Sequence, residues 1–385
     1  MDKHLLFDIL SQPTAPYRER HVIRVIMRAL QKRGVPHFQD PVGNIIIGVK
    51  SRAEYLARIQ KKTKEPVRVF IAHLDHPGFH GVKWVTKKLL AIQWYGGSPT
   101  KLLNGAALWS GDARGWLSEG KLVRPKMHKS GRWLEKGFIQ FKDEQTRAKQ
   151  PDATKIYGGF RFRAPVWEKN QILYTKAADD LIGAFAITSV GLDFKKMKGD
   201  HFLGVLTRAE EVGFIGAIGH LELGWLQKAK RPVVAVSLEA SRTLPGAKIG
   251  AGPVVRLGDR ATVFNPNALK VFAGVAEKVL PKKHQKRVMD GGTCEATAAT
   301  AYGFPAIGIS VPLGNYHNES YEGGPDSRGH RGPGPEFVHL NDIEGMLKLC
   351  QALVKPGLPW AQPWEKQRRK LKQSFRKSAR LLKNI

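Results

Sequence analysis

Four short, largely apolar runs constrain the fold of this chain more than any other feature. They span residues 67–72, 202–206, 233–238 and 306–311. Runs of this length are typical of strands that are buried on both faces of a helix-covered sheet. Helical patterns at residues 16–33 and 265–280 are interspersed with them. The sequence therefore predicts an α/β fold.

Histidine and acidic residues follow three of these runs directly. His73 and Asp75 come after the first run, Glu210 and Glu211 after the second, and Glu239 after the third. Ligands bind at the carboxyl ends of strands in open α/β sheets, and a divalent cation relieves the repulsion between adjacent carboxylates. The alternatives are an ordinary loop for the His-Asp pair and a solvated acidic turn before a helix for the Glu pair.

Two further positions complete the pattern. Asp179 and Asp180 precede an apolar helix that Gly183 opens, and His317 lies on the loop after the fourth run. Capping of the helix N-terminus is the alternative role for the Asp pair.

Together these positions form a ligand set for metal ions. Two imidazoles and three carboxylates are what two Zn²⁺-class ions need, and one carboxylate would bridge the ions. The predicted ligands are His73, Asp179, Glu211, Glu239 and His317. Glu210 is adjacent to a ligand but left free, and it is the predicted general acid/base.

The segments that carry these residues resemble the dizinc aminopeptidases of the tetrahedral, or glutamyl-aminopeptidase-like, family. The matching pieces are HLDHPGF, KAADDLIGA, TRAEEVGFIGA, VSLEAS and GGTCEATAATAYGFPAIGISVPLGNYHN, and the resemblance covers residues 5–355. It implies a mixed-sheet dizinc exopeptidase (phosphorylase/hydrolase-like) core with an inserted small β-barrel domain. It also implies a homo-oligomer that acts on short peptides. The expected cofactors are two divalent metal ions, zinc first, with cobalt or manganese as alternatives.

The resemblance also implies a role for each ligand. His73 and Glu239 would be the terminal ligands of one ion, and Glu211 and His317 those of the other. Asp179 would be the bridging carboxylate.

The remaining site residues take their roles from the same resemblance. Glu210 resembles the general base, Asp75 the residue that orients His73, and the Asp179–Asp180 peptide bond is expected to be cis. Alternation along a strand independently places Asp75 on the same face as His73, where it can fix the tautomer of the ring.

Spacing separates the aminopeptidase interpretation from the first of two alternatives. Asp179 lies 106 residues after His73, which leaves room for an inserted domain, whereas Glu239 follows Glu211 by only 28. The related carboxypeptidases and deacylases insert their extra domain after the Glu pair. A dimetal carboxypeptidase or N-acyl amino acid deacylase is the first alternative. A polyanion-binding protein with a residual peptidase site is the second.

Some residues depart from the family pattern. Leu181 stands where an Arg is common, and Cys294 and Glu295 stand where an Asp is usual. These departures put the substrate preference and the assembly in doubt. An inert residue at a helix start is the preferred interpretation of Cys294.

The length of 385 residues favours more than one domain. Residues 1–82 and 169–360 are predicted to form a discontinuous catalytic domain, and 83–168 an inserted β domain. Residues 361–385 form a basic tail in which Leu371, Phe375 and Leu382 share a helical stripe. Weak polyanion binding through this tail is expected, with a solvated tail as the alternative.

The composition bears on the charge and the cellular compartment of the protein. The net charge is +30, from 63 Lys and Arg against 33 Asp and Glu. Two cysteines exclude a disulfide framework, and the sequence contains neither a signal-peptide pattern nor an apolar run long enough to span a membrane. A cytoplasmic protein is therefore expected.

Overall fold

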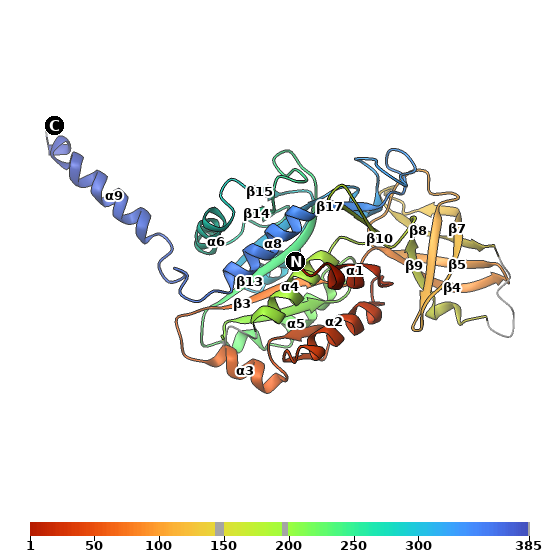
Figure 1. The fold of residues 1–385 in the computed structure, drawn as a ribbon, viewed down its shortest axis with the longest axis horizontal. Coiled ribbons are helices and arrows are strands. Elements are labelled where there is room, and N and C mark those ends of the chain that lie inside the picture. Colours follow the sequence, from red (N-terminus) through yellow and green to blue (C-terminus); the bar gives the residue numbers. More distant parts are fainter. Residues whose placement is uncertain (143–149, 195–198, 384–385) are drawn as a thin grey trace.

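The computed structural model describes residues 1–142, 150–194 and 199–383, and its core is an eight-stranded mixed sheet (Figure 1). The strand order is β1-β2-β12-β3-β13-β16-β14-β15. The strands are β1 (His37–Gln39), β2 (Ile45–Ile47), β3 (Val67–His73), β12 (Phe202–Thr207), β13 (Val233–Arg242), β14 (Val254–Asp259), β15 (Gln285–Met289) and β16 (Ala306–Leu313). The four apolar runs form the central strands β12, β3, β13 and β16, which are mutually parallel. The predicted α/β fold with a mixed sheet is confirmed.

Helices cover both faces of this sheet, which explains why its central strands are largely apolar. Phe70 and Ala72 of β3 pack into one hydrophobic cluster, and Val69 and Ile71 pack into a second cluster on the other face. The first cluster contains residues of α1 (Lys3–Ser11), α2 (Arg20–Lys32), α4 (Leu181–Phe194), α6 (Pro266–Val279) and α8 (Leu340–Leu353). The second contains residues of α3 (Arg52–Gln60), α5 (Ile215–Glu222) and α7 (Glu295–Ala301).

A closed antiparallel barrel lies at one end of the molecule (Figure 1). Its strands are β4 (Gly78–Thr86), β5 (Leu89–Tyr95), β6 (Ala107–Asp112), β7 (Gly115–Met127), β8 (Leu134–Phe141) and β9 (Tyr157–Phe160). A separate hydrophobic cluster that includes Phe79, Leu108 and Ile139 fills it. The expected small β-barrel is therefore present. The division at residues 83 and 168 stays a prediction, and the barrel strands themselves run from Gly78 to Phe160.

A three-stranded antiparallel sheet connects the barrel to the last part of the core. Its strands are β10 (Val166–Lys169), β11 (Ile172–Thr175) and β17 (Glu336–His339). Because β11 pairs with β17, the segment that leads to Asp179 runs beside the segment that begins with Glu336.

Two expected element boundaries were wrong. The helix expected from Pro16 begins at Arg20, because Tyr17 has a positive φ of 66° that an α-helix cannot contain. Glu239 lies inside β13 rather than at its end, because residues 240–242 continue the pairing with β16.

The end of the described chain is helical and basic. Helix α9 (Glu365–Ser378) and a short 3₁₀ segment (Ala379–Lys383) extend away from the body, at the opposite end from the barrel in Figure 1. Within the described ranges, no helix combines the length and the apolar character needed to cross a bilayer. Cys294 and Cys350 are both buried and free.

Candidate functional site

The parallel strands bring the predicted ligands together at their carboxyl edge. His73 ends β3, Glu211 follows β12, and Glu239 lies near the end of β13. Asp179 directly precedes α4, and His317 lies in a 3₁₀ turn (Tyr316–Asn318) after β16. Residues that are distant in sequence therefore meet because parallel strands end at the same edge of the sheet.

Asp179 lies between the two histidines. Its Oδ1 is 3.4 Å from His73 Nε2, and its Oδ2 is 3.8 Å from His317 Nε2. Glu211 Oε2 lies 3.1 Å from the same nitrogen of His317. Two groups of potential ligands share Asp179, one completed by His73 and Glu239, the other by Glu211 and His317. Within each group the ligand atoms lie within 4.8 Å of one another.

Several of these atoms are buried without a hydrogen-bond partner. They are Asp179 Oδ1, Glu211 Oε1, Glu239 Oε1 and His317 Nε2. Buried polar atoms are normally satisfied, so orphaned ones that converge on a point need an explanation. Carboxylate oxygens and imidazole nitrogens are ligands that divalent zinc-class ions accept. The residues present therefore fit divalent ions of this class.

His73 is oriented by Asp75. Its Nδ1 lies 3.2 Å from the main-chain oxygen of Asp75 and 3.6 Å from the Asp75 carboxylate. A proton held on Nδ1 by these acceptors leaves the lone pair of Nε2 directed toward Asp179.

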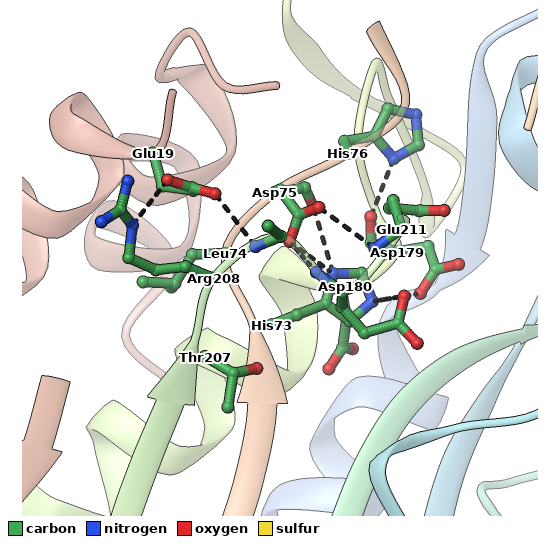
Figure 2. A network of polar contacts seen from close by, with 12 residues as sticks. Glu19, His73, Leu74, Asp75, His76, Asp179, Asp180, Thr207, Arg208 and Glu211 are labelled. Carbon is green, nitrogen blue, oxygen red and sulfur yellow. Dashed lines mark hydrogen bonds and ion pairs between the residues drawn. The ribbon is translucent and has the colours of Figure 1, made fainter. Parts of the chain in front are cut away.

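The Asp75 carboxylate has a second task that the sequence pattern did not predict. Its two oxygens accept hydrogen bonds from the backbone N–H groups of Glu210 and Glu211, at 3.0 and 3.2 Å. Glu19, which is fully buried, accepts from the preceding N–H of Ala209 at 3.0 Å and from Arg208 Nε at 2.8 Å (Figure 2). Three successive backbone N–H groups are thus held by two buried carboxylates, which fixes the direction of the Glu pair.

Glu336 performs the equivalent task for the other two ligand loops. Its Oε2 accepts from the N–H groups of Ala178 and Asp179, at 2.6 and 3.1 Å, and its Oε1 accepts from the N–H of His317 at 2.9 Å. His317 has a left-handed backbone with φ of 55°, a conformation that costs free energy in a non-glycine residue. The fully buried Glu336 therefore ties the backbones of Asp179 and His317 together. Nothing in the local sequence around Glu336 indicated this role.

The Asp pair combines the two roles that the sequence left open. The Asp179–Asp180 peptide bond is cis, as the resemblance implied. Asp180 Oδ1 accepts from the N–H of Gly183 at 3.1 Å in the first turn of α4, whereas Asp179 faces the histidines. Asp180 therefore caps the helix, and Asp179 is left for the site.

Glu295 places an additional carboxylate in the site. It is fully buried, accepts from Thr207 Oγ1 at 2.7 Å, and lies in a group with Glu210 and Glu239. The neighbouring Cys294 is the buried N-cap of α7, and burial raises the pKa of its thiol to about 12. This pKa agrees with an inert cysteine.

Charge crowding shifts the pKa values of the site. Burial, opposed by His73 and reinforced by Glu211, raises the pKa of Glu210 well above its ordinary value. Burial likewise raises the pKa of Glu239 and of Glu336. The pKa of His73 is raised although burial lowers it, because Glu210 and other carboxylates surround the ring.

The barrel region reaches the site through one close approach. A Cβ atom on Gly97, just after β5, would lie 1.9 Å from Nδ1 of His317, so only glycine fits against the ring. On the other side of the site, Glu239 borders a cavity of about 30 Å³ whose lining includes Arg242, Arg256 and Tyr316. The ligands therefore sit between the sheet edge and the barrel.

The α/β core and its buried carboxylate–histidine centre define a peptide-hydrolysing enzyme of the metal-dependent exopeptidase class. A family model of the M42 glutamyl aminopeptidases matches residues 54–322. The chain belongs to the M42 glutamyl aminopeptidase family, which confirms the resemblance seen in the sequence. A sequence search of curated proteins gives no match.

Solved structures of similar proteins share the fold. A TET aminopeptidase from a marine sediment Thaumarchaeota archaeon is 20% identical, with a TM-score of 0.71, and the match covers 92% of this chain and 96% of that chain. The Pyrococcus horikoshii TET1 peptidase, which can assemble into a tetrahedron or a large octahedral shell, is 20% identical with a TM-score of 0.70, over 92% and 99%. An aminopeptidase from the archaeon Desulfurococcus kamchatkensis is 19% identical with a TM-score of 0.71, over 94% and 97%.

Metal removal is predicted to make stability strongly dependent on pH. In the metal-free protein, the raised pKa values of Glu210, Glu239 and His73 mean that the folded state keeps protons that the unfolded state releases. The free energy of unfolding should therefore fall as pH rises from the ordinary carboxyl pKa of about 4.3. A divalent ion at 100 times its Kd should restore about 2.7 kcal/mol.

Urea unfolding of chelator-treated and zinc-loaded protein, at about pH 5 and about pH 8, measures this effect. The gain from metal should be larger at the higher pH, because fewer protons compete for the ligands. An equal gain at both pH values would contradict the assignment of these residues as ligands.

Replacement of Glu336 tests the tie between the two ligand loops. Glu336→Gln removes one acceptor oxygen, so the backbones of Asp179 and His317 lose part of their support. Metal affinity, measured by competition with a chelating dye, should fall about 10- to 100-fold. Glu277→Gln, a charge-matched change at an exposed position, should leave the affinity unchanged. Equal affinities for the two variants would show that Glu336 does not support the site.

Proposed function

We propose that this chain removes N-terminal residues from short peptides with the help of two divalent ions, zinc being the first candidate. One observation supports this most strongly: each oxygen of Asp179 faces a different histidine, and Glu239 and Glu211 complete the two ligand groups. In this proposal His73 and Glu239 would hold one ion, Glu211 and His317 would hold the other, and Asp179 would contribute an oxygen to each.

We assign the proton transfers to Glu210. When bound, divalent ions at such a centre polarise the scissile carbonyl and make water more acidic. Glu210 lies outside the two groups that share Asp179, and its Oε2 is 3.8 Å from His73 Nε2. It takes a proton from the attacking water and passes the proton to the leaving nitrogen. The Asp75 contact to the Glu210 N–H supports this role by fixing the backbone from which the carboxylate extends.

Selectivity for an N-terminal residue follows from the charge of the site. Carboxylates such as Glu210 and Glu295 attract the positive α-amino group of a peptide and leave an acylated amine without a charged partner. The cavity beside Glu239 is too small for a side chain, but the exposed Arg242 in its lining would favour an acidic group on the first residue of the substrate.

A related structure supports a proposal about the oligomeric state. The Pyrococcus horikoshii TET1 peptidase can form a tetrahedron or an octahedral shell. We propose that this chain also forms a homo-oligomer. The carboxypeptidase or deacylase alternative keeps the same metal centre and changes the substrate. The polyanion-binding alternative rests on the net charge of +30 alone.

Replacement of the proposed base should abolish turnover without loss of metal. Glu210→Gln keeps the shape of the side chain but cannot accept the proton, so kcat should fall about 10²- to 10⁴-fold. Hydrolysis of aminoacyl anilides and elemental analysis of the same samples measure activity and metal content. Glu222→Gln, at the exposed end of α5, is the matched control and should behave like the unchanged protein. Undiminished turnover by Glu210→Gln would remove Glu210 from the mechanism.

A substrate panel should separate the proposed activities. Glutamyl substrates with a free amino group should give kcat/KM values at least about tenfold higher than lysyl or N-acetylated ones. Arg242→Gln should narrow the gap between glutamyl and lysyl substrates, whereas Arg52→Gln, on the surface of α3, should not. Faster turnover of N-acetylated substrates would favour a deacylase instead.

A further inference from the structure

The C-terminal helix presents an uncovered apolar surface. Helix α9 contains no buried residue, and Leu371 and Phe375 are 63% and 61% exposed. These two residues are four positions apart and therefore share one face of the helix. Leu381 and Leu382 continue the apolar character into the 3₁₀ segment and are also exposed. An amphipathic helix normally buries its apolar face, so this one lacks a partner within the described chain.

The rest of the helix is strongly cationic. After Pro363 the sequence has nine Lys and Arg residues and one acidic residue, Glu365. Glu365 contacts Arg368 and lies 2.8 Å from Arg369, both within its own helix. Arg368 lies three positions before Leu371 and Lys372 three positions before Phe375, so cationic side chains flank the apolar face directly.

The start of the helix is attached to the body. Trp364 Nε1 donates to Asn267 Oδ1 at 2.8 Å, and the Lys270 ammonium lies 4.8 Å from the centre of the Trp364 ring. From this point α9 leaves the body on the side away from the barrel (Figure 1). Trp364 is still 45% exposed at the base of the helix. An attached base and a projecting, uncovered helix suit contact with something outside the molecule.

Charge and apolar surface together select the partner. Pairing this helix with the same helix of a second copy would bring two sets of nine Lys and Arg residues together. Single-stranded RNA would neutralise the cations and stack a base on Phe375, but it would leave Leu371, Leu381 and Leu382 in water. An anionic lipid surface accommodates both the cationic residues and the apolar face. Lysine and arginine lie among the headgroups, and leucine and phenylalanine enter the boundary of the acyl chains. Partly exposed tryptophan is also favoured at that boundary.

We propose that α9 is a surface anchor that lies in the plane of an anionic lipid bilayer and holds the enzyme there. The helix is too short and too charged to span the bilayer, so it binds at the interface. In this arrangement the barrel lies at the far end of the molecule from the lipid (Figure 1). The proposal is independent of the peptidase chemistry.

Vesicle sedimentation with the full-length protein tests the anchor. The protein should bind vesicles of phosphatidylcholine mixed with phosphatidylglycerol, bind pure phosphatidylcholine vesicles far less, and lose affinity as salt is added. The double variant Leu371→Gln with Phe375→Gln keeps the charge and the helix propensity. It should bind mixed vesicles at least about tenfold more weakly. Val263→Gln removes an apolar side chain that is 80% exposed on the body and should bind like the unchanged protein.

Three results would overturn the proposal. The first is no binding to mixed vesicles at low salt. The second is equal binding by the unchanged protein and the double variant, which would mean that the net charge of the body is sufficient. The third is tight binding of single-stranded RNA that does not depend on Leu371 and Phe375, together with weak vesicle binding, which would assign the helix to nucleic acid. Circular dichroism and peptidase activity of the double variant report that the body is folded.

Discussion

The concentration of carboxylates at one edge of the sheet is the constraint on which the rest of the site depends. Five carboxylates lie close together there and are buried or partly buried: Asp179, Glu210, Glu211, Glu239 and Glu295. Buried like charges repel strongly, so such a cluster persists only when positive charge or hydrogen-bond donors surround it. Two histidines supply part of this compensation, and the unpartnered oxygens indicate where divalent ions supply the remainder.

Backbone N–H groups provide much of the positional control. Asp75, Glu19 and Glu336 each accept hydrogen bonds from backbone N–H groups in the segments that carry the clustered side chains. Asp75 and Glu19 hold the segment of Glu210 and Glu211, and Glu336 holds those of Asp179 and His317. The positions of the clustered side chains are thus fixed by a second group of buried acids that hold the backbone.

The barrel and the tail add features outside this centre. The barrel strands lie between His73 and Asp179 in sequence, and Gly97 brings that region against the ring of His317. The tail, in contrast, leads away from the site. Helix α9 leaves the body at Trp364 and contributes no buried residue to the core. Catalysis and attachment to a surface can therefore be altered separately.

Local sequence patterns determined the central strands and the residues that gather at their ends. The apolar runs became β12, β3, β13 and β16, and His73, Asp179, Glu211, Glu239 and His317 converge as the resemblance implied. Each of these signals is local: a run of apolar residues predicts a buried strand, and a polar residue after it predicts an exposed edge.

Only the tertiary structure revealed Glu19, Glu336 and the position of Glu295. Glu336 contacts Asp179 from 157 positions away, and Glu19 contacts Ala209 from 190. A buried carboxylate that accepts from a distant backbone N–H has no periodicity and no neighbouring motif, so the sequence contains no local trace of it. The exposure of Leu371 and Phe375 could not be predicted from the sequence either. A sequence pattern shows that a helix is amphipathic, but only the tertiary structure shows whether its apolar face is covered.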